Sequence, residues 1–169
     1  VDPGRGAERF PQLFGAPLSV VIWTTTPWTI PSNRGIAFNP NIAYALYEVA
    51  DAPKDNWARP GDRYLLAANL AETVFAQARV ASYTKIAEIG PGALAAMVCA
   101  HPFAKLDNHW DYEVPMLPGD FVTDDAGTGF VHMAPSHGAD DYELFVKNGL
   151  VDRMTHNVRE DSSFADHVP

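Results

Sequence analysis

Short apolar segments, each ended by proline, glycine, asparagine or aspartate, recur along this sequence and limit the folds open to it. They are rich in Val, Ile, Leu, Tyr and Phe, which fit a pleated and half-buried strand. The segments predicted to be strands are residues 18–25, 35–38, 43–49, 63–67, 84–89, 114–117, 121–123 and 128–133. Residues 94–100 are also apolar, but periodicity does not decide between helix and strand there.

Two segments carry helix signals. Asn69 and Glu72 have the spacing of a capping box ahead of an apolar face, which predicts a helix over residues 69–81. A second helix is predicted over residues 139–147, ended by Asn148-Gly149. Many short strands with few helices indicate a mixed α/β, β-rich fold that resembles a barrel, rather than an alternating parallel sheet.

The length and composition of the chain predict one soluble domain. A chain of 169 residues with 47% hydrophobic and 20% charged residues can bury one compact core. No apolar run approaches the length that crosses a bilayer, so no membrane contact is expected. We also expect the fragment to be monomeric. Residues 1–17 form an irregular lead-in, and the start at Val1 without an initiator methionine suggests a piece of a longer protein, so residues 1–169 are assigned to a single excised domain.

Cysteine usage points to a reducing compartment such as the cytoplasm. Cys99 is the single cysteine, which excludes an intrachain disulfide framework and a Cys-x-x-Cys metal site. Because Cys99 lies in an apolar run without basic neighbours, we favour a small buried hydrophobe over a nucleophile.

The segment from Trp23 to Asn33 holds four threonines and two tryptophans directly after an apolar run. Pro27 removes an amide donor and ends the strand, so the threonines lie at a strand end. Hydroxyls and free backbone amides there can bind a polar ligand, and Trp28 offers an aromatic wall. The simpler alternative is structural, because threonine favours strands and satisfies local backbone groups.

A distant segment, Gly127-Thr128-Gly129-Phe130-Val131-His132-Met133-Ala134-Pro135-Ser136-His137-Gly138-Ala139-Asp140-Asp141-Tyr142, completes a recognisable pair. Together the two segments resemble the threonine-rich peptide and the GTG-x-VH-x-AP-x-HG-x-DDY peptide of the editing domain of isoleucyl-tRNA synthetase. The resemblance covers residues 18–150. Valyl and leucyl editing domains carry an arginine after the threonines, where this chain has Pro27 and Trp28, which favours the isoleucyl branch.

The resemblance implies a closed β-barrel decorated by helices, and it assigns roles to individual residues. Asp141 would bind the α-ammonium of the substrate, and His132 would form a pocket wall against the amino-acid side chain. The implied substrate-binding positions around the terminal adenosine and ester are Thr24, Thr25, Thr26, Trp28, Thr29, Asn33, Gly127 and Gly129. Gly127 and Gly129 have a plain alternative as turn residues with positive φ.

Other readings of the acidic and histidine residues stay open. Asp140 is expected to be a helix-end charge, and the same reading would apply to Asp141 from position alone. His132, His137 and the two aspartates could in principle bind zinc, but Pro135 between the histidines puts them on different local elements. We therefore predict no metal, and a structural role for His137.

The resemblance implies an aminoacyl-tRNA deacylase that hydrolyses Val-tRNA(Ile) as the second sieve of an isoleucine-tRNA ligase, with valyl-adenylate as a second candidate substrate. Its partners would be the 3′-terminal aminoacyl-adenosine of tRNA(Ile) and the rest of the synthetase. No cofactor is expected here, because the HIGH-like and KMSKS-like peptides of the ATP-using catalytic domain are absent. The net charge of −9 argues against broad phosphate binding, so we expect weak tRNA affinity. A metal-dependent hydrolase and a noncatalytic tRNA 3′-end binding module are the alternatives.

Overall fold

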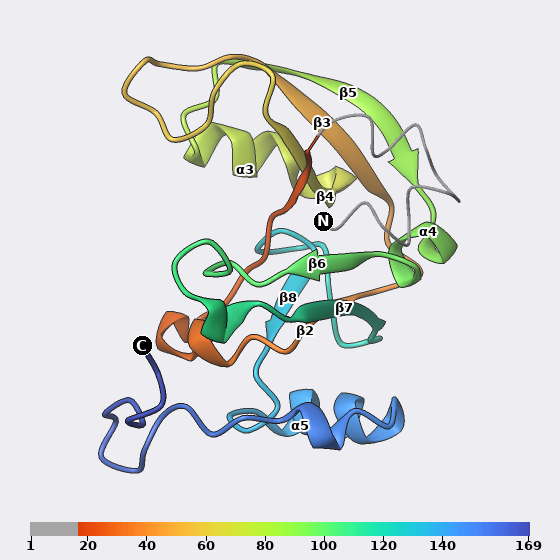
Figure 1. The fold of residues 1–169 in the computed structure, drawn as a ribbon. Coiled ribbons are helices and arrows are strands. Elements are labelled where there is room, and N and C mark those ends of the chain that lie inside the picture. The colour runs from red at the N-terminus through yellow and green to blue at the C-terminus, as the bar shows by residue number, and fades with distance from the viewer. Residues whose placement is uncertain (1–16) are drawn as a thin grey trace.

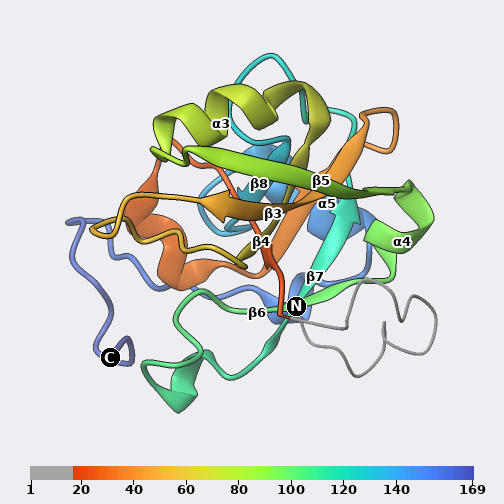
Figure 2. The same cartoon turned by 90° about the horizontal axis from the view of Figure 1, so that it is seen from above.

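The computed structural model describes residues 17–169, and in it two four-stranded sheets lie between helices (Figures 1 and 2). The first sheet has the order β1-β4-β3-β5 and the second the order β6-β7-β2-β8. The strands are β1 (Ser19–Val20), β2 (Gly35–Phe38), β3 (Tyr44–Asp51), β4 (Arg63–Ala67), β5 (Ser82–Ile89), β6 (Val98–Ala100), β7 (Glu113–Pro118) and β8 (Phe130–Met133). The helices are η1 (Pro27–Ser32), η2 (Ala68–Leu70), α3 (Ala71–Gln77), α4 (Pro91–Ala95), η3 (Asn108–Trp110), α5 (Ala139–Lys147) and η4 (Val151–Arg153).

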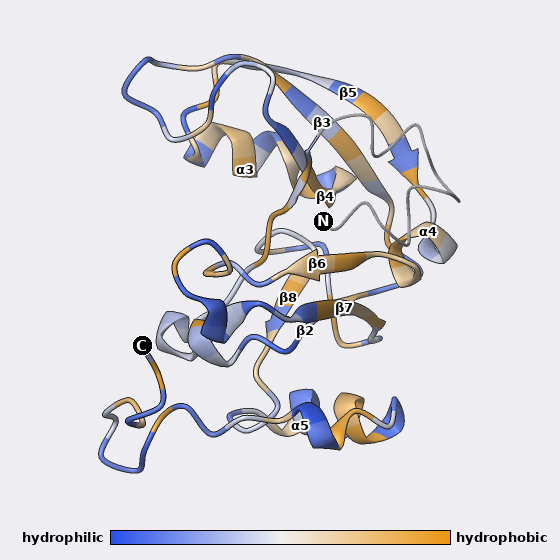
Figure 3. Cartoon of the chain, in the orientation of Figure 1, coloured by the Kyte–Doolittle hydropathy of each residue, from blue (hydrophilic) through white to orange (hydrophobic). Residues whose placement is uncertain are grey.

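The hydrophobic core has three parts, one between each pair of neighbouring layers. In β3, Tyr44 and Leu46 point into the space between the sheets, whereas Ala45, Tyr47 and Val49 point toward α3. Both faces of β3 are therefore buried, which is why its sequence lacks a polar face. On the far side, α5 packs Leu144 and Phe145 against the outer face of the second sheet. Figure 3 shows the resulting mixture of apolar and polar residues along α5.

The two sheets are joined along one side by the chain that follows β1. β1 itself pairs with β4 in parallel, and the chain after it then forms an isolated bridge between Trp23 and Val131 of β8. Ala67 N of β4 also donates to Thr128 O just before β8, at 2.9 Å. These bonds bring residues 24–29 beside the end of β8.

The closed barrel that we expected is not confirmed. Between β1 and β6 lies a cavity of about 640 Å³ with mostly apolar walls, including Leu18, Ile22 and Phe103. The same region buries Cys99 against the inter-sheet core, and burial raises the pKa of its thiol to about 11. The fold is thus mixed α/β and β-rich, with two sheets that hydrogen-bond along one side.

Several element boundaries differ from the sequence prediction. The predicted strand 18–25 forms a ladder only at Ser19–Val20, because the chain leaves the first sheet to bridge β8. Residues 121–123 form no strand: Val122 N bonds Gly119 O in a turn, and the side chain is buried. The ambiguous run 94–100 divides between the end of α4 and β6.

The predicted capping box is also wrong. The helix starts with a 3-10 turn and then α3, and no side chain caps either part. Asn69 Nδ2 donates instead to Asp124 Oδ2 at 2.8 Å. The helix ends at Gln77, four residues before the predicted position at Ala81, because Arg79 adopts a positive φ of 55°. By contrast α5 has the predicted bounds: it ends at Lys147 and is followed by Asn148 and then Gly149, whose φ is +67°.

Among residues 17–169, no helix is both long and apolar enough to cross a membrane. Residues 1–16, the greater part of the expected lead-in, lie outside the described residues.

Candidate active site

The two segments singled out in the sequence meet in one pocket of about 240 Å³. The threonine-rich segment supplies one side, and the end of β8 with the start of α5 supplies the other. The lining residues are Trp23, Thr24, Thr25, Thr26, Thr29, Val131, His132, Ala134, His137, Gly138 and Asp141. Residues more than a hundred positions apart in the sequence therefore share one polar cavity.

Backbone hydrogen bonds to β8 position the threonine side of the pocket. Trp23 N donates to Phe130 O at 2.9 Å, and His132 N donates to Trp23 O at 3.1 Å. The chain then turns, with Thr24 Oγ1 accepting from Thr26 N at 3.0 Å. Pro27 occupies the first turn of η1, where its missing N–H costs nothing.

Three of the four threonines are bonded to one another. Thr26 Oγ1 lies 3.3 Å from both Thr24 Oγ1 and Thr29 Oγ1, and Thr29 Oγ1 donates to Thr26 O at 2.7 Å. Thr25 is exposed and has no hydrogen bond to another described residue. Thr25 is thus the threonine whose hydroxyl is free for a ligand.

His132 forms a rigid and neutral wall. Its side chain is 4% exposed, Nε2 lies 3.0 Å from Thr29 Oγ1, and Nδ1 accepts from Asn33 Nδ2. Because Thr29 Oγ1 donates to Thr26 O, the network fits a ring that carries its proton on Nε2. Burial, with a smaller contribution from His101, lowers the pKa of His132 to about 4.

Asp141 lies in the first turn of α5, where a carboxylate interacts favourably with the helix dipole. Its Oδ2 accepts from Ala134 N at 2.6 Å, while Oδ1 has no partner among residues 17–169. Burial raises the pKa of this carboxyl, and the Ala134 bond partly opposes that rise. A Cβ on Gly138 would lie 3.1 Å from Asp141 Cγ, so glycine leaves room for the carboxyl group.

Four predicted binding residues do not line this pocket. Trp28 is 57% exposed on η1, and Asn33 is fully buried behind His132. Gly127 and Gly129 have φ of +75° and +79°, and a Cβ on Gly127 would meet the Trp23 ring at 2.8 Å. Both glycines therefore shape the turn before β8.

The remaining acidic and histidine residues are arranged without a metal centre. Within residues 17–169, no three His, Cys, Asp or Glu side chains are grouped so that they could hold a metal ion. Asp140 is exposed and forms no hydrogen bond or ion pair through its side chain with another residue of 17–169. His137 lines the pocket, although we expected a structural role, and burial lowers its pKa.

Sequence reasoning missed several lining residues: Trp23, Val131, Ala134, His137 and Gly138. All five lie within the two segments that the sequence analysis singled out, although no role was assigned to them as pocket lining. Their orientation depends on the Trp23–Val131 bridge, which no local pattern announces.

No protein-family model matches the chain. Curated proteins do match it. The isoleucine–tRNA ligase of Bradyrhizobium diazoefficiens is 50% identical over 161 residues, which are 91% of this chain and 16% of that protein. That of Caulobacter vibrioides is 47% identical over 168 residues, which are 95% of this chain and 17% of that protein.

This chain is a homologue of the isoleucine–tRNA ligases. It spans about a sixth of the length of the curated relatives that it matches.

Solved structures with this fold are editing domains of a related synthetase. A crystal structure described as GlLeuRS-CP1 superposes with a TM-score of 0.66 at 20% identity, over 97% of this chain and 63% of that chain. The cytosolic leucyl-tRNA synthetase editing domain of P. falciparum gives a TM-score of 0.57 at 15% identity, over 98% and 62%. The chain therefore has the fold of the leucyl editing domains.

Proposed function

We propose that this chain hydrolyses the ester bond of mischarged Val-tRNA(Ile) and thereby edits the product of an isoleucine–tRNA ligase. The observation that carries the proposal is the convergence of Asp141, His132 and the threonine-rich segment on one pocket. Homology to isoleucine–tRNA ligases and the editing-domain fold support it independently.

The physical need for a second site follows from the weakness of hydrophobic discrimination. A pocket that accepts isoleucine rejects valine by only about 1–3 kcal/mol, because the two side chains differ by one methylene group. This magnitude is general, and the isoleucyl enzymes are its established example. A second pocket that is sized for valine can instead reject isoleucine, because the extra methylene overfills a tightly packed site. The pocket described here is small, and His132 is fixed on two sides.

In the proposed mechanism Asp141 anchors the α-ammonium group of the substrate. Its Oδ2 is already held by Ala134 N, which fixes the carboxyl group and leaves Oδ1 for the ligand. The neutral ring of His132 then faces the aliphatic side chain without attracting the ammonium group. A fixed wall and a charged anchor that line the same pocket would define the space for valine.

The threonine-rich segment would bind the adenosine and the ester, with Thr25 offering the free hydroxyl. Exposed Trp28 lies outside the cavity, where it could contact the nucleotide. A water molecule, oriented by backbone groups and by the free ribose hydroxyl, would attack the ester carbonyl. The bond between the carbonyl carbon and the ribose oxygen would then break, and the ribose oxygen would leave with a proton from the water, which gives free valine and tRNA. No covalent nucleophile and no cofactor is required, so acceleration would come from positioning and oriented dipoles.

Two other functions make different predictions. A metal-dependent hydrolase using His132, His137 and Asp140 would lose activity with a chelator. A noncatalytic module for the tRNA 3′ end would bind without turnover. The grouping of side chains in residues 17–169 gives the first no support, and the net charge of −9 gives little to the second.

The decisive experiment is a deacylation assay that compares Val-tRNA(Ile) with Ile-tRNA(Ile), with and without a chelator. We expect hydrolysis of the valyl ester, little hydrolysis of the isoleucyl ester and no chelator effect. Equal hydrolysis of both esters would remove the sieve, and binding without turnover would favour the noncatalytic module. The cytoplasmic location, the monomeric state and the hydrolysis of valyl-adenylate stay predictions.

A further inference from the structure

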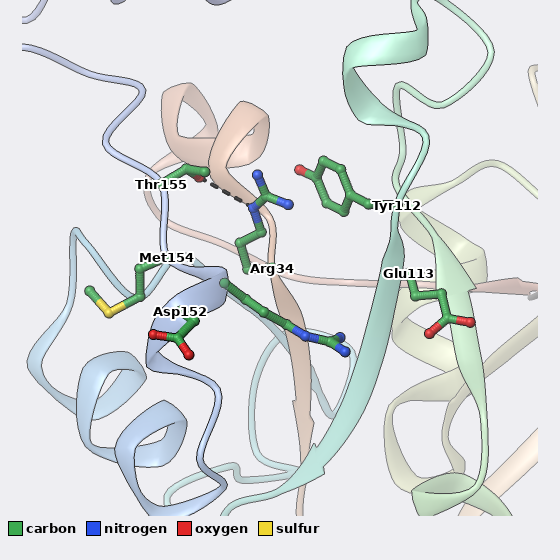
Figure 4. Close-up of a pocket in the computed structure, with 7 residues that line it drawn as sticks. Arg34, Tyr112, Glu113, Asp152, Met154 and Thr155 are labelled. Carbon is green, nitrogen blue, oxygen red and sulfur yellow. Dashed lines mark hydrogen bonds between the residues drawn. The ribbon is translucent and has the colours of Figure 1, made fainter.

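A second hollow, of about 390 Å³, lies beside η4 and is lined by two arginines, Arg34 and Arg153 (Figure 4). Arg34 is held in place from two sides. Its Cζ lies 3.7 Å from the centre of the Tyr112 ring, and its Nε donates to Thr155 Oγ1 at 3.3 Å. The terminal nitrogens of this guanidinium group have no partner among residues 17–169, so they remain free to bind.

Neither guanidinium group is neutralised. The described residues form ion pairs at Arg63, Arg79, Lys85 and Arg159, but none at Arg34 or Arg153. Glu113 and Asp152 also line the hollow, yet Figure 4 shows both carboxylates directed away from the guanidinium group of Arg34. Burial lowers the pKa of Arg34 and the adjacent Tyr112 partly opposes this, while Arg153 lowers the pKa by a smaller amount because the two positive charges repel each other. An anion between them would relieve this repulsion.

The hollow is connected to the candidate active site through one corner of the chain. Arg34 follows Asn33 directly, and Asn33 donates to His132 in the wall of the active-site pocket. Tyr112 Oη, behind Arg34, donates to Asn33 O at 3.2 Å, and Arg34 N donates to Met133 O at 2.9 Å. The side chains of Asn33 and Arg34 thus link the wall of one cavity to the wall of the other.

We propose that Arg34 and Arg153 bind a backbone phosphate of the tRNA acceptor end whose aminoacyl group enters the threonine-lined pocket. This inference rests on the proposed function, because that function makes an aminoacyl-tRNA the substrate. A phosphate fits the hollow better than a carboxylate side chain, because it presents several oxygens to two separate guanidinium groups. A single phosphate contact also agrees with weak RNA binding by a chain of net charge −9.

The test measures how tightly the Arg34→Gln and Arg153→Gln variants bind an RNA minihelix that ends in CCA and carries no amino acid. Binding is measured over a series of salt concentrations. Arg79→Gln is the matched control, because exposed Arg79 is paired with Asp55 elsewhere on the molecule. We expect about tenfold weaker binding in each hollow variant, and a slope of log K against log salt that is smaller by about 0.7–0.9. Arg153 is exposed, so its variant keeps the test valid if Arg34→Gln folds poorly.

The outcomes separate this inference from the proposed function. Weaker binding in both hollow variants but not in Arg79→Gln supports the phosphate site, even if the chain fails to hydrolyse Val-tRNA(Ile). Equal binding by all three variants, or no binding by the unsubstituted chain at low salt, overturns it, even if deacylation is intact. The inference is also overturned if the unsubstituted chain binds inorganic phosphate in the hollow but Arg34→Gln and Arg153→Gln bind the RNA as well as it does. An acidic surface of another polypeptide would then be the better occupant.

Discussion

The two sides of the candidate active site satisfy their polar groups differently. On the threonine side, Thr24, Thr26 and Thr29 bond to one another and to His132. On the helix side, Asp141 has one backbone partner, a carboxyl oxygen without a partner among the described residues, and a pKa raised by burial. The three threonines and His132 form a bonded frame, with Ser32 Oγ and Asn33 Oδ1 buried near it without a partner among the described residues. Asp141, by contrast, lines the pocket with one carboxyl oxygen still unbonded.

This difference indicates which residues carry ligand binding. A buried polar group without a full set of partners costs free energy, so it persists where a ligand completes it. Asp141 is half-buried and its Oδ1 has no partner among residues 17–169, so a ligand can complete it, whereas the hydroxyls of the bonded threonines already have partners. Substitutions on the helix side should therefore change function first, and those within the frame should change stability first.

The largest effect is expected for Asp141→Ala. At about 4 Å and an effective dielectric constant near 20, the ammonium contact is worth at most roughly 4 kcal/mol. Deacylation of Val-tRNA(Ile) should therefore slow by roughly 10²- to 10³-fold, at about tenfold per 1.4 kcal/mol. The matched control is Asp140→Ala, which removes an exposed neighbouring charge and should be much milder. Near-normal deacylation by Asp141→Ala would show that the ammonium group is bound elsewhere.

His132→Ala tests the wall that belongs to the frame. Removing the ring opens volume for an extra methylene while leaving Asp141 in place. Discrimination against Ile-tRNA(Ile) should fall by about 10- to 200-fold, measured as the ratio of the two deacylation rates. The variant also leaves Asn33 and Thr29 without their ring partners, at about 1–3 kcal/mol in unfolding free energy. If stability falls and Ile-tRNA(Ile) remains intact, His132 is structural and the steric boundary must be sought among the other lining residues, first at Val131.

Gly138→Ala perturbs the helix side without removing a functional group. Alanine tolerates the backbone conformation of Gly138, with φ of −151° and ψ of 138°. Its Cβ would lie 3.1 Å from Asp141 Cγ and should displace the carboxyl group. Deacylation should slow by roughly tenfold, because misplacement of about 1 Å can cost up to 10². Gly90→Ala is the control, since nothing lies within 4 Å of its Cβ position; equal rates in both variants would show that the position of Asp141 is not critical.

A pair of threonine variants separates binding from framework. Thr25→Ala removes a free, exposed hydroxyl and should weaken deacylation by about two- to tenfold, with an unchanged melting temperature. Thr29→Ala removes the hydroxyl that bridges His132 and Thr26 O, and should lower the unfolding free energy by about 1–3 kcal/mol. Thr29→Ser, which keeps the hydroxyl, should recover most of that loss. A destabilised Thr25→Ala would contradict the distinction.

The sequence predicts an element well when the residues that determine it are close together in the chain, and poorly when distant residues determine it. Helix α5 was predicted to its ends because its stop signal, Asn148-Gly149, is local. The capping box at Asn69 failed because the strand before it leads directly into a 3-10 turn, and a distant residue, Asp124, binds the Asn69 side chain. Local patterns are reliable only where no tertiary contact competes for the same groups.

The same reasoning applies to the candidate site. Motif resemblance singled out Asp141, His132 and the threonines, and the fold places them in one pocket. The burial of Asn33 behind His132 was not predictable, because the sequence cannot say which face of a chain turn points inward. The arginine hollow was missed for a related reason, since Arg34 and Arg153 are far apart in sequence and carry no motif.

The smallest expected effect is on stability, in Asp141→Asn. The pKa of Asp141 is raised in the folded protein, so the folded state binds this proton more tightly than the unfolded chain. Its contribution to stability is therefore fully present below the unfolded pKa and is lost as the pH rises through the folded pKa. Asparagine keeps the shape and an acceptor for Ala134 N, but carries no charge to desolvate.

At pH 7 we expect Asp141→Asn to lose deacylation activity to an extent similar to Asp141→Ala and yet to be slightly more stable, with a melting temperature raised by less than about 2–4 °C. The gain should shrink as the pH falls and disappear below the unfolded pKa, where the aspartate is itself neutral. Thermal melts of both proteins across this pH range measure the difference. His137 interacts with Asp141, so a change in the titration of His137 is part of the measured effect. An asparagine variant that is less stable at pH 7 would mean that the bond from Ala134 N and the helix dipole outweigh the burial of the charge.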